Sequence, residues 1–406
     1  MEKSTMNREE LMEKLKNISE YGMYTGSLAG KIEEVVSRAE KKQLKINVAG
    51  ALNNFDHSHK LLPLLKKDIK DIVKGLELVG NLVNAEKYLL YVPEGEEDFA
   101  KAAVQAAKEE GVLLEIIYGM VNTRKEQGLL LHMESLRKIY ILSEGKKEED
   151  MPLCIEYITS KESKEIVSMR RVKANSTFSD LLDLPKENIK AVKIAGRLYR
   201  PKILDQALEE RVTFGDGVIR IYDKSCCIVD SVEKDIHRER EESCGKCTFC
   251  REGLYQFDLR LEEIKSKKGD TKALEVMKRI GRAMTFNTLC SVGQFSSFEL
   301  LDSLELFADE YEEHIKKKNC PAGVCKAFTS MYIDPRKCKG CGECLKVCGE
   351  DCIEGFTGYI HMIEDDYCSK CDACSSVCPE KAIYKVKEKL PKLPDRLTRV
   401  GFFKRF

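Results

Sequence analysis

Two runs of cysteine with identical spacing lie near the C-terminal end of this 406-residue chain. They are Cys338-x2-Cys341-x2-Cys344-x3-Cys348 and Cys368-x2-Cys371-x2-Cys374-x3-Cys378-Pro379. Three closely spaced thiolates wrap one side of an iron–sulfur cube, and the chain must leave before it can supply a fourth, so the fourth cysteine of each run binds the other cluster. The spacing predicts two 4Fe-4S clusters, one on Cys338, Cys341, Cys344 and Cys378 and one on Cys368, Cys371, Cys374 and Cys348.

Zinc also accepts four thiolates, but zinc sites usually present cysteines as separated pairs rather than as triplets. One departure from the usual ferredoxin run follows Cys348, where the chain reads Gly349-Glu350-Asp351-Cys352 in place of a proline. Cys352 could therefore compete as a ligand or serve elsewhere.

A third triplet stands earlier in the chain, in Cys244-x2-Cys247-x2-Cys250. Its fourth cysteine would be Cys290. The helices between the two segments would fold back and so bring Cys290 to the triplet. This pattern predicts a third 4Fe-4S cluster on Cys244, Cys247, Cys250 and Cys290. The alternative is a group of free thiols.

Composition excludes several other classes of protein. A disulfide framework is typical of short secreted chains, and this chain of eighteen cysteines is long and begins without an apolar signal segment. Lys+Arg and Asp+Glu balance at 68 each, so charge does not favour nucleic acid. No run approaches the roughly 18 apolar residues of a membrane span. We expect a cytoplasmic protein with reduced, metal-binding thiols.

Strand and helix patterns predict a multidomain α/β plus α+β chain. Apolar runs at 45–50, 87–93 and 113–119 alternate with amphipathic stretches at 62–84 and 96–110, which indicates a layered α/β domain over 1–150. Short strand runs around one helix at 177–183 indicate a β-grasp-like domain over 151–228. The remaining segments are a helical bundle at 229–318, a CPAGVC linker at 319–330, a ferredoxin-like module at 331–388 and a tail at 389–406.

The last bundle helix is predicted to begin at a cap on Ser296 or Ser297 and to end at Lys318, with an apolar stripe from Phe298 to Ile315. The basic, proline-punctuated tail is interpreted as a docking extension, with a disordered terminus as the alternative.

The bundle motifs ESCGKCTFCREG and LCSVGQ resemble ESCGKCxPCREG and LCxLGQ of the NADH-binding flavoprotein subunits of respiratory complex I and its relatives, which include those of soluble formate dehydrogenases and electron-bifurcating hydrogenases. The resemblance implies that the β-grasp-like domain is the soluble-ligand-binding (SLBB) domain of that family. CPAGVC followed by two ferredoxin runs looks like the electron-bifurcating hydrogenase branch. Family members bind FMN and NADH through a GRGGAGFPTG loop and an acidic CGEET-type segment.

Both nucleotide motifs are degenerate here. Where the glycine loop is expected the chain offers YTGSLAGK, with Gly26 and Gly30, and the acidic segment is replaced by EQGLL. Two isolated glycines cannot supply a string of convergent N–H donors to a phosphate. We therefore interpret Gly26 and Gly30 as an ordinary turn and helix start, and we do not expect FMN.

Four residues remain unassigned near the module: Cys320, Cys325, Cys352 and His361. Three thiolates and an imidazole suit a structural, tetrahedral zinc, and the alternative is buried free thiols with a surface histidine. Cys226 and Cys227 are assigned to core packing. His57 and His59 are assigned to a solvated loop.

These features indicate an electron-relay subunit of a multisubunit oxidoreductase. Its partners would be subunits that carry flavin or a catalytic metal in a hetero-oligomeric complex, and a ferredoxin is a further candidate. One alternative is an FMN-containing NADH dehydrogenase subunit. An alternative of another class is an iron–sulfur sensor or scaffold. A sensor would need a basic, DNA-binding helix or a similar surface that passes on its signal, and the sequence shows none. No catalytic residue is assigned.

Overall fold

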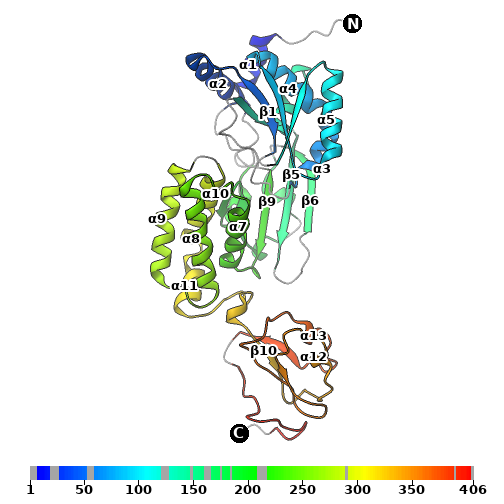
Figure 1. Cartoon of the computed structure of the whole chain (residues 1–406), viewed down its shortest axis with the longest axis vertical. Helices are drawn as coiled ribbons and strands as arrows, with labels where there is room; N and C mark the ends of the chain where they lie inside the picture. The colour runs from blue at the N-terminus through cyan, green and yellow to red at the C-terminus, as the bar shows by residue number, and fades with distance from the viewer. Residues whose placement is uncertain are drawn as a thin grey trace. The chain divides into compact units, whose positions relative to one another are not determined.

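Apolar runs in the first third of the chain form a four-stranded parallel sheet of order β3-β2-β1-β4 (Figure 1). The computed structural model describes residues 7–18, 27–52, 59–119, 128–146, 150–159, 166–173, 176–182, 185–207, 217–288, 291–387 and 390–403. The strands of this sheet are β1 (Asn47–Ala51), β2 (Lys87–Val92), β3 (Leu114–Tyr118) and β4 (Gly128–His132). The predicted layered α/β arrangement is confirmed.

Helices pack against this sheet through apolar stripes: α2 (Leu28–Lys42), α4 (Ile69–Val83), α5 (Glu97–Glu109) and α6 (Met133–Ser143). Helix α1 (Arg8–Leu15) contacts α2 and α6, and α3 (Leu62–Leu65) with the 3-10 turn η1 (Lys66–Asp68) leads into α4. In α4, Ile72, Leu76 and Val79 recur at three- and four-residue steps and are fully buried. Gly75 lies so close to α6 that a Cβ atom there would be 1.8 Å from the carbonyl oxygen of Leu136, so the α4–α6 contact requires glycine.

The second sheet has five strands in the order β6-β5-β9-β7-β8, with β5 and β9 parallel and the other pairs antiparallel. Its elements are β5 (Asp150–Ile158), β6 (Ile166–Lys173), β7 (Ile189–Ile194), β8 (Arg197–Tyr199), β9 (Val218–Asp223) and the 3-10 turns η2 (Phe178–Leu181), η3 (Lys186–Asn188) and η4 (Pro201–Asp205). The helix predicted at 177–183 is thus a single 3-10 turn, because Leu182 returns to extended backbone.

The first and second sheets share one apolar core, which runs without interruption from Leu11 to Ile221. Hydrogen bonds also link the two parts of this core, because Arg171 donates to Asp68 at 2.6 Å and to buried Glu134 at 3.1 Å. The predicted boundary at 150–151 therefore crosses a continuous hydrophobic interior.

Five helices follow: α7 (Ile228–Glu242), α8 (Thr248–Lys265), α9 (Thr271–Asn287), α10 (Ser291–Leu306) and α11 (Ala308–Lys316). The prediction of one helix capped at Ser296 or Ser297 is wrong. The helix already begins at Ser291, and both hydroxyls donate to carbonyls inside it, Ser296 to Val292 and Ser297 to Gln294. Phe307, with φ of −123°, then separates α10 from α11.

The C-terminal module is an internal repeat of short elements. After the 3-10 turn η6 (Lys326–Phe328) come β10 (Ser330–Ile333), α12 (Glu343–Lys346), β11 (Ile353–Glu354), β12 (Met362–Ile363), α13 (Ala373–Ser376) and β13 (Ile383–Val386). Antiparallel pairs join β10 to β13 and β11 to β12. Part of the tail packs on this module, because Ile360 donates to Thr398 and Val400 donates to Gly358. The described part of the tail is thus ordered against the module.

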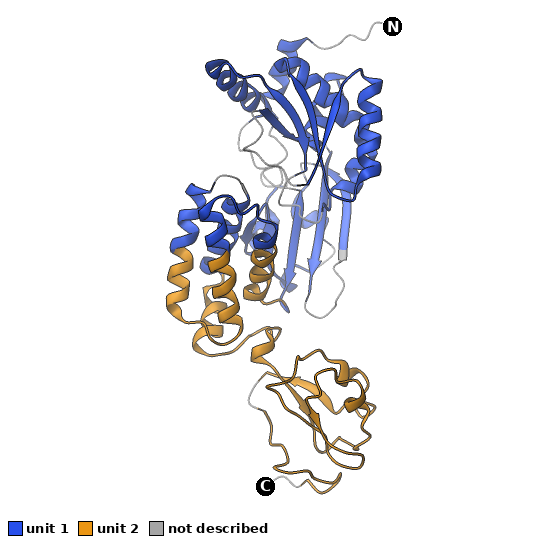
Figure 2. Ribbon diagram, viewed as in Figure 1, with its two compact units in different colours: residues 1–225, 239–254, 279–306 blue, residues 226–238, 255–278, 307–406 orange. Residues whose placement is uncertain are grey.

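Contacts divide the chain into two units (Figure 2). One comprises residues 1–225, 239–254 and 279–306, and the other comprises 226–238, 255–278 and 307–406. The triplet at 244–250 belongs to the first unit, and both ferredoxin runs belong to the second.

Helix α10 is held to the second sheet by ion pairs within the first unit. Arg197 donates to both carboxylate oxygens of Asp302, at 2.6 and 2.7 Å, and the backbone N–H of Leu198 donates to the same carboxylate at 3.2 Å. Lys193 pairs with buried Glu299 one turn earlier. These contacts fix the helix that begins directly after Cys290.

We predict that Arg197→Ala lowers the stability of the first unit by about 1–2 kcal/mol, because it leaves a mostly buried carboxylate without its bidentate partner. Thermal unfolding followed by far-UV circular dichroism measures the change. Lys186→Ala removes an exposed ion pair to Asp205 and serves as the control. Equal unfolding temperatures for the two variants would contradict the role given to Arg197.

We also predict an acid-sensitive helix start at His132. Its buried Nδ1 accepts the backbone N–H of Glu134 at 3.0 Å, and burial lowers the pKa of His132 to about 3, with Lys31 adding to the shift. Since the unfolded chain binds this proton more readily, stability is fully present above about pH 6.5 and is lost as the pH falls toward 3. The unfolding temperature of His132→Asn, which keeps a capping acceptor, should therefore fall less steeply than wild type between pH 7 and 5. Parallel curves would contradict this.

Candidate metal centres

The triplet Cys244, Cys247 and Cys250 lies at the turn between α7 and α8. Cys244 is exposed, Cys247 is half-buried and Cys250, in the first turn of α8, is buried. The hydroxyl of Ser243 lies 3.4 Å from the Cys250 sulfur and accepts the N–H of Gly245. The thiols thus lie on a turn that is braced by local hydrogen bonds.

Close packing of α8 on α9 brings the end of α9 to this turn. A Cβ atom on Gly253 would lie 2.2 Å from the sulfur of Met284, so glycine lets the antiparallel helices approach. Thr288, at the end of α9, is buried and donates to the carbonyl of Met284. Cys290 follows from this end of the helix and itself lies outside the described residues.

In the ferredoxin-like module, the second triplet (Cys368, Cys371 and Cys374) interacts with Cys348 of the first run. Burial raises the pKa of the Cys374 thiol, and the nearby sulfurs of Cys368, Cys371 and Cys348 raise it further. In the same way the pKa of Cys344 is raised to about 11 by burial and by the neighbouring Cys338 and Cys341. Cys348 of the first run thus interacts electrostatically with Cys374 of the second run.

Backbone N–H groups point at several of these sulfurs. Lys370 donates to Cys368 and Ala382 donates to Cys378, each at 3.4 Å. Burial alone would raise the pKa of Cys348, but N–H groups of the following turn, including those of Cys352 and Glu350, lower it. Such N–H···S bonds stabilise thiolates, and they fit sulfurs that hold an iron–sulfur cluster.

The residues predicted to hold zinc do not lie together. The sulfur of Cys352 is 3.6 Å from that of Cys348, and Nδ1 of His361 is 3.8 Å from the sulfur of Cys338. Cys352 and His361 thus adjoin the two ferredoxin runs, whereas Cys320 and Cys325 lie in a different group. The predicted zinc set is wrong in these two members, because the fold turns them toward the cluster cysteines.

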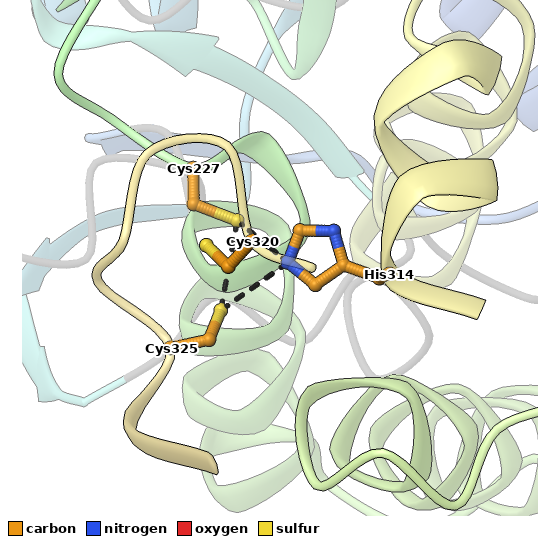
Figure 3. Close-up of side chains that lie close together, drawn as sticks. All are labelled: Cys227, His314, Cys320 and Cys325. Carbon is orange, nitrogen blue, oxygen red and sulfur yellow. Dashed lines mark hydrogen bonds between the residues drawn. The ribbon is translucent and has the colours of Figure 1, made fainter. Parts of the chain in front are cut away.

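Cys320 and Cys325 instead meet Cys227 and His314 (Figure 3). All four side chains are buried. Cys227 lies 3.4 Å from Nε2 of His314 and 3.7 Å from Cys325, and Cys325 lies 3.5 Å from the same nitrogen. Cys227 is therefore buried, as its assignment to core packing predicted, and it also lies among candidate metal ligands that the sequence pattern did not connect.

These distances fit one tetrahedral zinc ion. With bonds of about 2.3 Å to sulfur and about 2.0–2.1 Å to nitrogen, tetrahedral zinc separates two sulfurs by about 3.8 Å and a sulfur from a nitrogen by about 3.6 Å. Nδ1 of His314 lies 2.8 Å from the carbonyl oxygen of Glu310, which leaves Nε2 to face the thiols. The Glu310 carboxylate accepts the N–H of Ile228 at 2.8 Å and so ties α11 to the start of α7.

A second group of candidate ligands, Glu233, His237 and Asp258, lies between α7 and α8. The ammonium of Lys265 already bridges Glu233 to Asp230, and these two carboxylates hold its pKa above the ordinary value although burial opposes them. His237 is paired with Asp258 at 3.2 Å. The group is best described as an ion-pair network.

The candidate nucleotide loop lies within the described residues only from Ser27 onward. Gly30 lies in the first turn of α2, where its N–H donates to the hydroxyl of the capping residue Ser27 at 3.0 Å. Gly26 and His57 lie outside the described residues, and His59 adopts a positive φ of 51° before α3. Within the described parts of the chain, no helix combines the length and apolar character that crossing a membrane requires.

Comparison with known proteins finds similarity to subunits of NADH-quinone oxidoreductases and of an NADP-reducing hydrogenase. Residues 232–314 match the NADH-ubiquinone oxidoreductase-F iron-sulfur binding region. The HndC subunit of the NADP-reducing hydrogenase of Solidesulfovibrio fructosivorans is 37% identical over 141 residues, which is 35% of this chain and 29% of that protein. The F subunit of the NADH-quinone oxidoreductase of Streptomyces coelicolor is 33% identical over 113 residues, 28% of this chain and 25% of the relative. This chain thus spans less than a third of either relative.

The fold is shared with a solved structure, that of an NAD+-reducing [NiFe]-hydrogenase in the H2-reduced state. The TM-score is 0.61 at 16% identity, covering 76% of this chain and 63% of that chain. Residues 232–314 are thus similar to the iron–sulfur binding region of NADH-ubiquinone oxidoreductase F subunits, and the chain shares its fold with a chain of an NAD+-reducing hydrogenase.

Proposed function

We propose that the chain is an electron-relay subunit of a multisubunit oxidoreductase and that it carries three 4Fe-4S clusters. The observation that carries the proposal is the match of residues 232–314 to an iron–sulfur binding region, and the electrostatic interaction of Cys348 with Cys374 of the other run supports the exchange of the fourth ligands. The clusters would be held by Cys244, Cys247, Cys250 and Cys290, by Cys338, Cys341, Cys344 and Cys378, and by Cys368, Cys371, Cys374 and Cys348. When bound, they supply one-electron transfer, and the protein tunes it through burial and N–H···S bonds.

The flavin of the family is not part of this proposal. The N–H of Gly30 already donates to Ser27 and the N–H of Glu134 donates to the His132 imidazole, so one backbone donor at each of these two helix starts is used within the chain. Phosphate binding at a helix start depends on such donors being available to the ligand. Electrons would then come from or pass to partner subunits that hold flavin or a catalytic metal.

The predicted domains enter the proposal as an SLBB-like β-grasp sheet over 151–228, a bundle over 229–318 and a ferredoxin-like module over 331–388. We assign a structural zinc to Cys227, His314, Cys320 and Cys325, in the segment that joins bundle and module. Its four donors are all protein side chains and all buried, as in a closed structural site. Lys370 bonds the carbonyls of Lys326 and Thr329, which fastens the same segment to the module.

Anaerobically purified protein should contain about twelve iron and twelve acid-labile sulfide per chain, from three clusters of four. Cys290→Ala should lower both values by about four and leave the ferredoxin-like signals in the electron paramagnetic resonance spectrum, because this set shares no ligand with the others. Cys154→Ala, which alters a buried cysteine of β5, should keep the full content. Unchanged iron in Cys290→Ala would remove the third cluster from the proposal.

Metal analysis should also find about one zinc per chain, as expected for one tetrahedral site. Cys227→Ala should lose it, because three protein ligands hold zinc far less tightly than four. Cys226→Ala changes the adjacent buried cysteine and should retain it. Equal zinc in the two variants would show that the four residues are not its ligands.

A further inference from the structure

The two halves of the ferredoxin-like module differ at one turn. Corresponding cysteines are thirty residues apart, as in Cys348 and Cys378, and the turns after them share a left-handed residue, with φ of 52° at Asp351 and 48° at Lys381. The next residue is Cys352 in the first half and Ala382 in the second, and both are buried. One half therefore carries a thiol where the other carries a methyl group.

This thiol lies beside a proposed ligand of the cluster on Cys368, Cys371 and Cys374. Cys352 is 3.6 Å from Cys348, sulfur to sulfur, and it also interacts with Cys368. Both neighbours are proposed ligands of the same cluster. Cys352 is therefore a further thiol within reach of the position that Cys348 would fill.

The turn that carries the two thiols is also less constrained than its counterpart. Pro379 follows Cys378 and fixes φ, whereas Gly349 follows Cys348. A side chain on Gly349 would meet nothing within 4 Å, so the surroundings leave this turn room to shift. A small shift of the turn or a change of side-chain rotamer is enough to exchange two sulfurs this close together.

We propose, resting on the cluster assignment above, that Cys352 is a reserve ligand that can replace Cys348 on the cluster of Cys368, Cys371 and Cys374. In the exchange an iron–sulfur bond to Cys348 breaks and one to Cys352 forms, and the proton of the Cys352 thiol passes to Cys348. No electron is gained or lost. Cys378 has no such thiol beside it at the equivalent position, which is Ala382.

The equivalent positions in the two halves of the module provide the test, which uses the full-length protein. Cys348→Ala should keep about twelve iron per chain, whereas Cys348→Ala with Cys352→Ala, and separately Cys378→Ala, should each lose about four. A Cys348→Ala protein that contains about eight iron would overturn the reserve-ligand proposal. If the wild-type protein itself lacked either of the two ferredoxin-like clusters, the proposed function would be overturned instead.

A second variant keeps all four primary ligands and so avoids a folding defect. Cys352→Ala copies the alanine of the other half and should keep its iron at rest. During exposure to an iron chelator it should lose the second cluster faster than wild type, since a transiently released iron no longer finds a spare thiolate. Equal rates of loss in the two proteins would overturn the proposal.

Discussion

The sulfur–metal bonds proposed for the cysteines are the constraint on which the C-terminal part of the chain would depend. The strands of the ferredoxin-like module have two to four residues and its α-helices have four, which is too short for independent stability. Its buried cluster includes Cys338, Cys344, Cys352 and Cys374 beside a few isoleucines. The cysteines thus form much of the interior, and the metals they bind would take the place of a larger apolar core. The zinc proposed at Cys227 extends the same principle to the bundle.

The N-terminal part is organised differently. Its two sheets share one apolar core, reinforced by Arg171 between Asp68 and Glu134, and none of this depends on a metal. Removal of the first 140 residues would expose the buried face of the second sheet, so the role of this part is better tested by surface substitutions than by truncation. This part continues into α10 through the Arg197–Asp302 pair.

Sequence reasoning succeeded where the information is local. The strands at 47–51, 87–92 and 114–118 follow from short apolar runs, and α5 follows from its three- and four-residue spacing. It failed where contacts join distant segments. Cys227 and His314 are 87 residues apart, and only the packing of α11 beside the start of α7 brings them to Cys320 and Cys325. Similarly, the break at Phe307 is invisible in a continuous apolar stripe, because α10 and α11 share the same periodicity.

The central claim, a relay that holds clusters but no flavin of its own, is tested most directly by the source of the electrons that reduce the clusters. The intact chain is incubated with FMN, freed of unbound flavin, and exposed anaerobically to NADH or to dithionite while the electron paramagnetic resonance of reduced clusters is recorded. The account predicts reduction by dithionite and none by NADH, with no flavin released by acid. Cluster reduction by NADH, together with about one flavin released per chain, would contradict it by showing that a nucleotide site survives without the glycine-rich loop.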